Sequence, residues 1–253
     1  MKKVEKPKIV VVLGPTSSGK SDLAVIIAKK FNGEVISADS RQVYKGMDIG
    51  TGTVTKKEMQ GVPHHVLDIV SPKKSYSVGR FKRDAEKAIK DILSRGKLPI
   101  ICGGTGFYIQ AVVDGLVLPE VKPNESLRKG LEKLTVEELA NRLKKLDKER
   151  FKEIDTKNPH RLIRAIEIAT KLGNVPKVKK TSNYDVLQIG IKTDDHVLKE
   201  RIHKRLRKRM RRGMVAEAQR LHEQGVSWKR LERFGLEYKH LAHYLQEKLT
   251  KQE

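Results

Sequence analysis

The segment GPTSSGKS, at positions 14–21, constrains the fold of this chain more than any other part of the sequence. It matches the pattern G-x-x-x-x-G-K-[ST], in which glycines let backbone N–H groups surround phosphates at a helix N-terminus. An apolar run at 8–14 precedes it and a helical pattern at 21–31 follows it, which is the strand–loop–helix context that the pattern requires. We therefore expect Lys20 to reach the terminal phosphates and the Ser21 hydroxyl to hold Mg²⁺. The residues expected to surround the phosphates are Gly14, Pro15, Thr16, Ser17, Ser18, Gly19, Lys20 and Ser21.

The first half of the chain alternates between apolar runs and helical patterns. The apolar runs cover 8–14, 34–37, 65–70 and 98–104. Helical spacing of apolar residues appears at 21–31 and 80–96. Strands that alternate with helices indicate a parallel sheet of the α/β class. The N-terminal run is charged and then apolar, like a signal peptide, but it is short and continues into the glycine motif, so a first strand is favoured.

The pattern changes after residue 118, where strand signals stop. Residues 125–173 show helical patterns only, and Thr135 with Glu138 forms a capping box. A stretch rich in helix breakers follows at 173–183. These features predict an all-helical insertion.

The sheet pattern returns in the last third of the chain. The apolar run 186–192 predicts one more buried strand, and a long helix follows at 196–213. On that helix Ile202, Leu206 and Met210 form an i, i+4 seam that we expect to face the protein. The predicted units are a core of residues 1–118 and 186–253 and an insertion of residues 119–185.

The charge of the chain is strongly positive. Its net charge is +23, from 54 basic and 31 acidic residues. A surplus of this size favours a polyanionic partner, most often nucleic acid. The segment 199–212 alone carries nine Lys or Arg residues against one Glu, whereas a solvated helix face normally carries interspersed glutamates. The alternative, a charged surface of the thermophile kind, usually has balanced signs.

The cysteine and histidine residues of the chain indicate in which cellular compartment it works and whether it has a metal site. The single cysteine, Cys102, lies in an apolar run and predicts a buried thiol in a reducing compartment. No run of 18 apolar residues occurs, so we expect a cytoplasmic protein with no membrane span. The pair His64 and His65 suggests a metal site, but no cysteine or second histidine cluster supports it, so a structural role is expected.

A polar turn follows the second apolar run, in the sequence VISADSRQVY at 35–44. In a parallel core the strands end at the edge where ligands bind, so Asp39 is expected across the site from Lys20. Its carboxylate has three open roles: magnesium ligand, general base or turn cap. The glycine turn at 102–113 places the Thr105 hydroxyl at the same edge, where the simplest role is a helix N-cap.

The order of several segments resembles the tRNA dimethylallyltransferases, which prenylate N6 of adenosine 37 beside the anticodon. The segments are GPTSSGKS (14–21), ISADSRQVYKGMDIGT (36–51), VPHHVLDIVSP (62–72), YSVGRFKRDA (76–85), GGTGFYIQA (103–111) and NPHRLIRAIEI (158–168). The resemblance covers about residues 8–240 and implies a P-loop NTPase-like parallel sheet flanked by helices, with an all-helical insertion domain. It implies transfer of a dimethylallyl group from dimethylallyl diphosphate to tRNA, with release of pyrophosphate.

The resemblance also implies roles for particular residues. Asp39 would accept the proton of the adenine N6 amino group as general base, and Thr105 would lie near the same base. Lys20, Mg²⁺ and Arg205 would absorb the charge of the departing pyrophosphate. The reacting base would have to flip out of its stack into the site. The residues implied as tRNA contacts are Asp39, Ser40, Arg41, Gln42, Thr105, Arg128, His160, Arg161, Leu162, Ile163 and Arg164. The implied partners are the tRNA anticodon stem-loop and dimethylallyl diphosphate, bound by a monomer.

Two segments depart from the family's pattern. The sequence RFGLEYKHLA at 233–242 replaces the commoner Gly-x-Gly-Tyr-Arg/Lys form and places Glu237 in its middle. The chain ends at YLQEKLTKQE, where the family usually continues with a helix that carries a Lys-Arg-Gln segment.

Three other classes of protein share part of this pattern. They are a P-loop small-molecule kinase, an isopentenyltransferase that acts on free AMP, ADP or ATP, and a non-catalytic RNA-binding P-loop protein. The basic surplus favours RNA over free nucleotides. Pyrophosphate release and phosphoryl transfer separate a prenyltransferase from a kinase.

Overall fold

The computed structural model describes residues 5–250, which form two compact units. The first, here called the core unit, runs to Gly115 and resumes at Ser182; the second, the insertion unit, is Leu116–Thr181. No helix within residues 5–250 is both long enough and apolar enough to cross a membrane.

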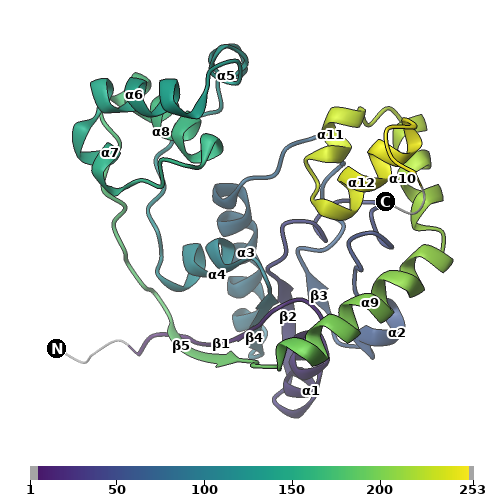
Figure 1. Ribbon diagram of the computed structural model, residues 1–253. Coiled ribbons are helices and arrows are strands. Elements are labelled where there is room, and N and C mark those ends of the chain that lie inside the picture. The colour runs from purple at the N-terminus through teal and green to yellow at the C-terminus, as the bar shows by residue number, and fades with distance from the viewer. Residues whose placement is uncertain (1–4, 251–253) are drawn as a thin grey trace. The chain divides into compact units, whose positions relative to one another are not determined.

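A five-stranded parallel sheet forms the centre of the core unit, in the order β3-β2-β4-β1-β5 (Figure 1). The strands are β1 Lys8–Leu13, β2 Gly33–Ser37, β3 His64–His65, β4 Leu98–Gly103 and β5 Asp185–Gly190. Val12 of β1 pairs with Cys102 of β4, so these two strands end side by side. The predicted parallel sheet of the α/β class is thus confirmed.

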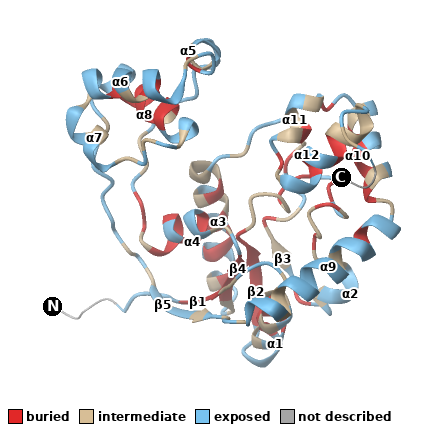
Figure 2. Ribbon diagram, viewed as in Figure 1, coloured by how far each residue is buried: buried red, intermediate tan, exposed pale blue. Residues whose placement is uncertain are grey.

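Two strands differ from the sequence prediction. β3 covers two residues rather than 65–70, because Val66 and Asp68 take φ angles of 62° and 49°, which strand backbone cannot adopt. β5 is exposed rather than buried, and Leu187 keeps 61% of its surface in solvent. The reason is its place at the edge of the sheet, where only β1 flanks it (Figure 2).

Alternation along the strands supplies two hydrophobic layers, one on each face of the sheet. The helices of the core unit are α1 Lys20–Lys30, α2 Lys56–Met59, α3 Val78–Ser94, α4 Gly106–Val113, α9 Asp195–Arg211, α10 Met214–Glu223, α11 Trp228–Glu232 and α12 Leu236–Leu245. Val10 and Val12 pack with α1, whereas Ile9 and Val11 pack in the layer that holds α3, α4 and α10–α12. Both faces are therefore filled, and the carboxyl ends of the strands are left to form a site.

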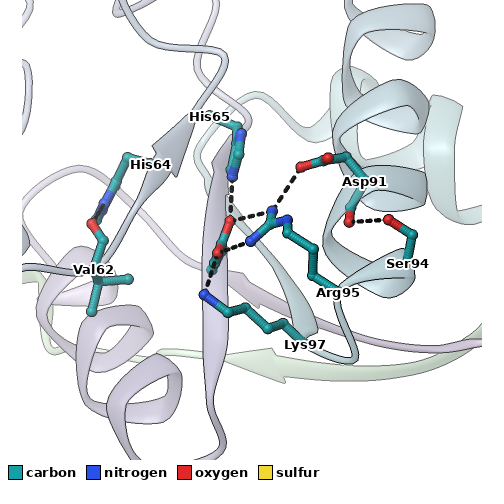
Figure 3. Close-up of polar contacts among 8 residues, drawn as sticks. Val62, His64, His65, Asp91, Ser94, Arg95 and Lys97 are labelled. Carbon is teal, nitrogen blue, oxygen red and sulfur yellow. Dashed lines mark hydrogen bonds and ion pairs between the residues drawn. The ribbon is translucent and has the colours of Figure 1, made fainter.

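A charged network ties the sheet together near the amino end of β2 (Figure 3). Glu34 is 2% exposed, and its carboxylate accepts hydrogen bonds from Arg95 and, at 2.7 Å, from Lys97. His65 Nε2 lies 2.7 Å from the same carboxylate. The hydrogen bond from Arg95 is the largest cause that holds the pKa of Glu34 well below its usual range. His65 thus joins a structural network, and the ring of His64 lies 2.9 Å from the carbonyl of Val62.

Helix α9 does not turn its apolar seam toward the protein, and that prediction is wrong. Ile202, Leu206 and Met210 are 43%, 43% and 39% exposed, whereas Arg209 is only 8% exposed. The inward side of the helix carries Arg205 and Arg209. Their guanidinium groups donate hydrogen bonds to backbone carbonyls of the core unit, which offsets the cost of removing these charged groups from water.

The insertion unit is helical and has its own hydrophobic core. Its helices are α5 Glu125–Leu131, α6 Val136–Leu146, α7 Lys148–Glu153 and α8 Pro159–Leu172. Leu139 and Leu143 of α6 pack against Leu162 of α8. The capping box is confirmed, since Thr135 Oγ1 accepts from the Glu138 N–H at 3.2 Å and the Glu138 carboxylate accepts from the Thr135 N–H at 2.7 Å.

Candidate active site

The phosphate-binding loop lies between β1 and α1, at the carboxyl edge of the sheet. Ser17 and Gly19 take left-handed φ angles of 64° and 90°, the kind of backbone with which a loop can curve around an anion. A Cβ at Gly14 would lie 2.9 Å from Ser18 Oγ and 3.1 Å from a backbone oxygen, so a side chain there would crowd the loop. The Ser17 and Ser18 hydroxyls are buried and have no hydrogen-bond partner among the described residues. Buried, unpaired hydroxyls in such a loop are suited to a phosphate oxygen.

Lys20 lies at the start of α1 and points back over the loop. Its Nζ donates to the carbonyl of Pro15 at 3.0 Å. Burial is the largest cause that lowers the pKa of Lys20, and the nearby Asp39 carboxylate acts in the opposite direction. Cys102 is buried as predicted, and burial raises the pKa of its thiol to about 11. The thiol is therefore neutral, and Lys20 supplies the positive charge at this position.

Asp39 follows β2 and faces the same cavity as Lys20. Its Oδ1 accepts hydrogen bonds from the N–H groups of Arg41 at 2.8 Å and Gln42 at 3.3 Å, so one oxygen caps the turn. The other oxygen has no hydrogen-bond partner within the part of the chain that the structure describes. Thr105 stands at the N-cap position of α4, but its hydroxyl accepts from the Ser40 N–H at 3.0 Å instead of capping the helix.

Two arginines of α9 complete the cationic side of the site. Arg205 donates to the carbonyl of Gly52 at 3.1 Å. Arg209, which the sequence prediction missed, donates to the carbonyls of Gly50 at 3.1 Å and Thr51 at 3.2 Å. Burial lowers the pKa of Arg209 to about 10, and Glu237 pairs with it at 3.6 Å.

Lys20, Asp39 and the two arginines line one cavity of about 230 Å³, whereas Ser17, Ser18 and Gly19 line a neighbouring pocket that shares Lys20, Ser21 and Arg205 with it. The predicted residues on the wall of the first cavity are Thr16, Lys20, Ser21, Asp39, Arg41, Gln42 and Arg205. Residues that the sequence prediction missed include Thr51, Arg209, Glu237 and Tyr238. The sequence held one signal for Arg209: it lies one helical turn after Arg205 on the same basic helix. The cavity can hold an anion on one side and present a carboxylate on the other.

A divalent cation would need help from a bound phosphate. Within residues 5–250, no three His, Cys, Asp or Glu side chains cluster in a way that could hold a metal ion. Mg²⁺ is commonly bound by one or two protein ligands together with substrate phosphates. The Ser21 hydroxyl and the Asp39 carboxylate, both on the cavity wall, fit that pattern.

The insertion unit carries the remaining predicted contacts. The buried carboxylate of Glu167 binds the guanidinium of Arg128 at 2.9 and 2.8 Å and also that of Arg164. His160 and Arg161 are exposed. Leu162 and Ile163 are also predicted tRNA contacts, and these stay predictions. Both side chains are buried in the hydrophobic core of the unit, because they occupy the inward face of α8.

The parallel sheet, with a phosphate loop at its carboxyl edge and basic helices over it, defines a P-loop α/β protein. A model of the IPP transferase family matches residues 42–253. The chain is 44% identical to tRNA dimethylallyltransferase 2 of Citrifermentans bemidjiense, over 97% of this chain and 79% of that protein. It is also 44% identical to tRNA dimethylallyltransferase 2 of Treponema denticola, over 98% and 85%. The chain belongs to the IPP transferase family.

Solved structures agree with this assignment. The tRNA isopentenylpyrophosphate transferase of Bacillus halodurans is 38% identical, with a TM-score of 0.72 over 98% of this chain and 80% of that one. A eukaryotic dimethylallyltransferase, described as acting on tRNA, is 28% identical, with a TM-score of 0.77 over 96% and 69%.

Proposed function

We propose that this chain transfers the dimethylallyl group of dimethylallyl diphosphate to N6 of adenosine 37 in tRNA. One observation carries the proposal: Lys20 and Ser21 of the loop and two arginines of α9, suited to a diphosphate, line the same cavity as the Asp39 carboxylate, which is suited to taking a proton from an amine. The relatives named as tRNA dimethylallyltransferases support the choice of substrates.

In the proposed reaction a bond forms between adenine N6 and C1 of the dimethylallyl group, while the bond from C1 to the diphosphate oxygen breaks. The electron pair of the broken bond leaves with pyrophosphate, and the N6 proton passes to Asp39. The exocyclic amine of adenine is a poor nucleophile, so a carboxylate that takes its proton during attack lowers the barrier. The oxygen of Asp39 that does not cap the turn is the one suited to this role.

The leaving group needs positive charge around it. Lys20, Arg205 and Arg209 line the cavity and would stabilise the departing pyrophosphate together with the N–H groups of the loop. Bound Mg²⁺, held with the Ser21 hydroxyl, would supply further neutralisation of the phosphate oxygens. Thr105 binds the N–H of Ser40 and so would position the turn that carries Asp39.

The tRNA would be bound through its phosphates. His160 and Arg161 are exposed on α8, and Glu167 holds the guanidinium groups of Arg128 and Arg164 in one orientation. Basic side chains held in this way can follow a nucleic-acid backbone. Adenosine 37 would flip out of the anticodon loop to enter the cavity. We also propose that one chain suffices, since it supplies every group named above, and that it works in the cytoplasm with tRNA.

The test is a reconstitution with purified chain, dimethylallyl diphosphate, Mg²⁺ and tRNA transcript, followed by digestion and mass spectrometry of the nucleosides. We expect prenylated adenosine and one pyrophosphate per product. A transcript with guanosine at position 37 is the control. Prenylation of AMP but not of tRNA would favour the free-nucleotide enzyme. Phosphoryl transfer from ATP without prenyl transfer would favour a kinase, and tRNA binding without product would favour a non-catalytic RNA-binding protein.

A further inference from the structure

The core unit contains a second buried carboxylate that no part of the proposed reaction uses. Glu217 of α10 is 1% exposed. Its Oε2 accepts hydrogen bonds from the N–H groups of Asp48 at 2.9 Å and Ile49 at 2.8 Å. Its Oε1 accepts from the Gly50 N–H at 2.8 Å and from the Tyr238 hydroxyl at 2.7 Å. All four of these partners are neutral donors, three of them backbone N–H groups and one a tyrosine hydroxyl, where a counter-ion would be usual for a buried carboxylate.

The loop that Glu217 binds is the loop that holds the arginines. Three consecutive N–H groups, from Asp48 to Gly50, point toward Glu217. The carbonyls of Gly50 and Thr51 point to Arg209, and the carbonyl of the next residue points to Arg205. The loop therefore connects a buried carboxylate on α10 to both guanidinium groups on α9.

Close packing leaves this loop little freedom. A Cβ at Gly50 would lie 2.5 Å from the ring of Tyr238. A Cβ at Gly52 would lie 1.8 Å from Arg209 Nη2 and 2.3 Å from Arg205 Nη2. Glycine at both positions lets the Tyr238 ring and the guanidinium groups approach the loop backbone directly. Small movements of the loop would therefore move the arginines relative to Lys20.

We propose that Glu217 is a positioning residue for the diphosphate of the donor: it fixes the 48–52 loop, and the loop carbonyls aim Arg209 and Arg205 into the cavity opposite Lys20. This inference rests on the proposed function, because it takes the cavity to be the diphosphate site. Hydrogen-bond donors that are already held in orientation bind an anion more tightly than mobile donors, since no free energy is spent on orienting them when the anion binds. The orientation of Arg209 should depend on Glu217 more than that of Arg205 does, because both carbonyls that Arg209 binds lie next to the N–H groups that Glu217 holds.

The test compares Glu217→Gln with Glu34→Gln. Gln has the size of Glu, but its NH₂ group cannot accept from the loop N–H groups. Glu34 is the matched control, a buried carboxylate of the core unit that lies outside the cavity wall. The readouts are the melting temperature and the dissociation constant of inorganic pyrophosphate with Mg²⁺, measured by calorimetry well below both melting points. We expect both variants to melt earlier, and only Glu217→Gln to bind pyrophosphate more weakly, by about tenfold or more.

A double-mutant cycle with Arg209→Gln separates positioning from general loosening. In the Arg209→Gln background, adding Glu217→Gln should weaken pyrophosphate binding by a smaller factor than in the unmodified chain, because the effect through Arg209 is already lost and only the effect through Arg205 remains. The inference would be overturned if the losses of pyrophosphate binding free energy in the two single variants simply added in the double variant. It would also be overturned if Glu217→Gln bound pyrophosphate as tightly as the unmodified chain. Should Glu217→Gln fail to fold, Tyr238→Phe removes one of the four hydrogen bonds and should weaken pyrophosphate binding in the same direction; unchanged affinity there would also overturn it. Pyrophosphate binding needs no tRNA or prenyl transfer, so failure of the proposed reaction would be seen separately.

Discussion

One oxygen of the Asp39 carboxylate caps a turn, and the other is left for the proposed reaction. From the sequence, the roles of magnesium ligand, general base and turn cap were all open. The structure shows the cap directly, with Oδ1 bound to the N–H groups of Arg41 and Gln42. The cap leaves the second oxygen for a proton or a metal, so one of the other two roles can coexist with it.

The substitution Asp39→Asn separates those two roles. Asn keeps an oxygen that can accept from the turn N–H groups, so the fold and pyrophosphate binding should be unchanged. The single-turnover rate of prenyl transfer should fall by roughly 10²- to 10⁴-fold, because the general base is lost. If Asp39 were instead a magnesium ligand, pyrophosphate binding would weaken and extra Mg²⁺ would restore it. A normal single-turnover rate would remove Asp39 from the chemistry.

Glu237 lies in the segment 233–242, one of the two that depart from the family's pattern, and it is on the cavity wall. Its carboxylate pairs with Arg209 at 3.6 Å and would compete for that guanidinium with the diphosphate of the proposed reaction. We expect Glu237→Gln to tighten pyrophosphate binding two- to fivefold, as removal of a partly exposed pair worth about 0.5–1 kcal/mol would do. Glu232→Gln is the matched control, since Glu232 pairs with His243 at 3.3 Å outside the cavity. Weaker binding in Glu237→Gln would mean that Glu237 orients Arg209 rather than competing for it.

At the level of elements, local patterns predicted the strand–loop–helix unit and most helices. The phosphate loop and the capping box of Thr135 depend on neighbours within a few residues, so both can be predicted from the local sequence. Burial is different, because it depends on which partner packs against an element. The seam on α9 was therefore assigned to the wrong face, and β5 was expected to be buried although it lies at an edge. The hydrogen bonds between Glu217 and the 48–50 backbone join residues 167–169 positions apart, so no local sequence pattern predicts them.

The charged network around Glu34 makes a prediction about the sheet. The pKa of Glu34 is lowered from an ordinary value of 4.5, chiefly by the hydrogen bond from Arg95. A carboxyl whose folded pKa is lowered contributes stability above its unfolded pKa and loses it as pH falls through the folded value. Glu34→Gln should therefore cost about 2 kcal/mol of unfolding free energy at pH 7. That difference from the unmodified chain should shrink as pH falls below 4.5. Denaturant unfolding at several pH values measures it, and a pH-independent difference would contradict the network's role.

At the scale of the whole molecule, the two units divide the work in the proposed reaction. The insertion unit has its own core of Leu139, Leu143, Leu162 and Ile166, and the cavity wall consists of core-unit residues only. Replacing residues 116–181 by a short Gly-Ser linker should leave a folded core that binds pyrophosphate within about twofold of the full chain and loses most of its tRNA affinity. Circular dichroism tests whether the core folds, calorimetry measures its pyrophosphate affinity, and filter binding measures its tRNA affinity. Loss of pyrophosphate binding in a folded product would show that the insertion supports the site.

The positive charge of the whole chain predicts how tRNA affinity changes with salt concentration. A net charge of +23 is far more than a diphosphate requires, and the outward face of α9 carries Lys204 and Arg207 in solvent. If these side chains neutralise tRNA phosphates, tRNA affinity should fall linearly in log K against log salt, with about 0.7–0.9 of a unit of slope for each phosphate contacted. Lys204→Gln with Arg207→Gln should flatten that slope by about 1.5 units, because two contacts are removed. Lys87→Gln with Lys90→Gln, an equal loss of charge on the exposed side of α3, is the control and should leave the slope nearly unchanged. Equal slopes for the two double variants would mean that net charge alone, and not the face of α9, attracts the tRNA.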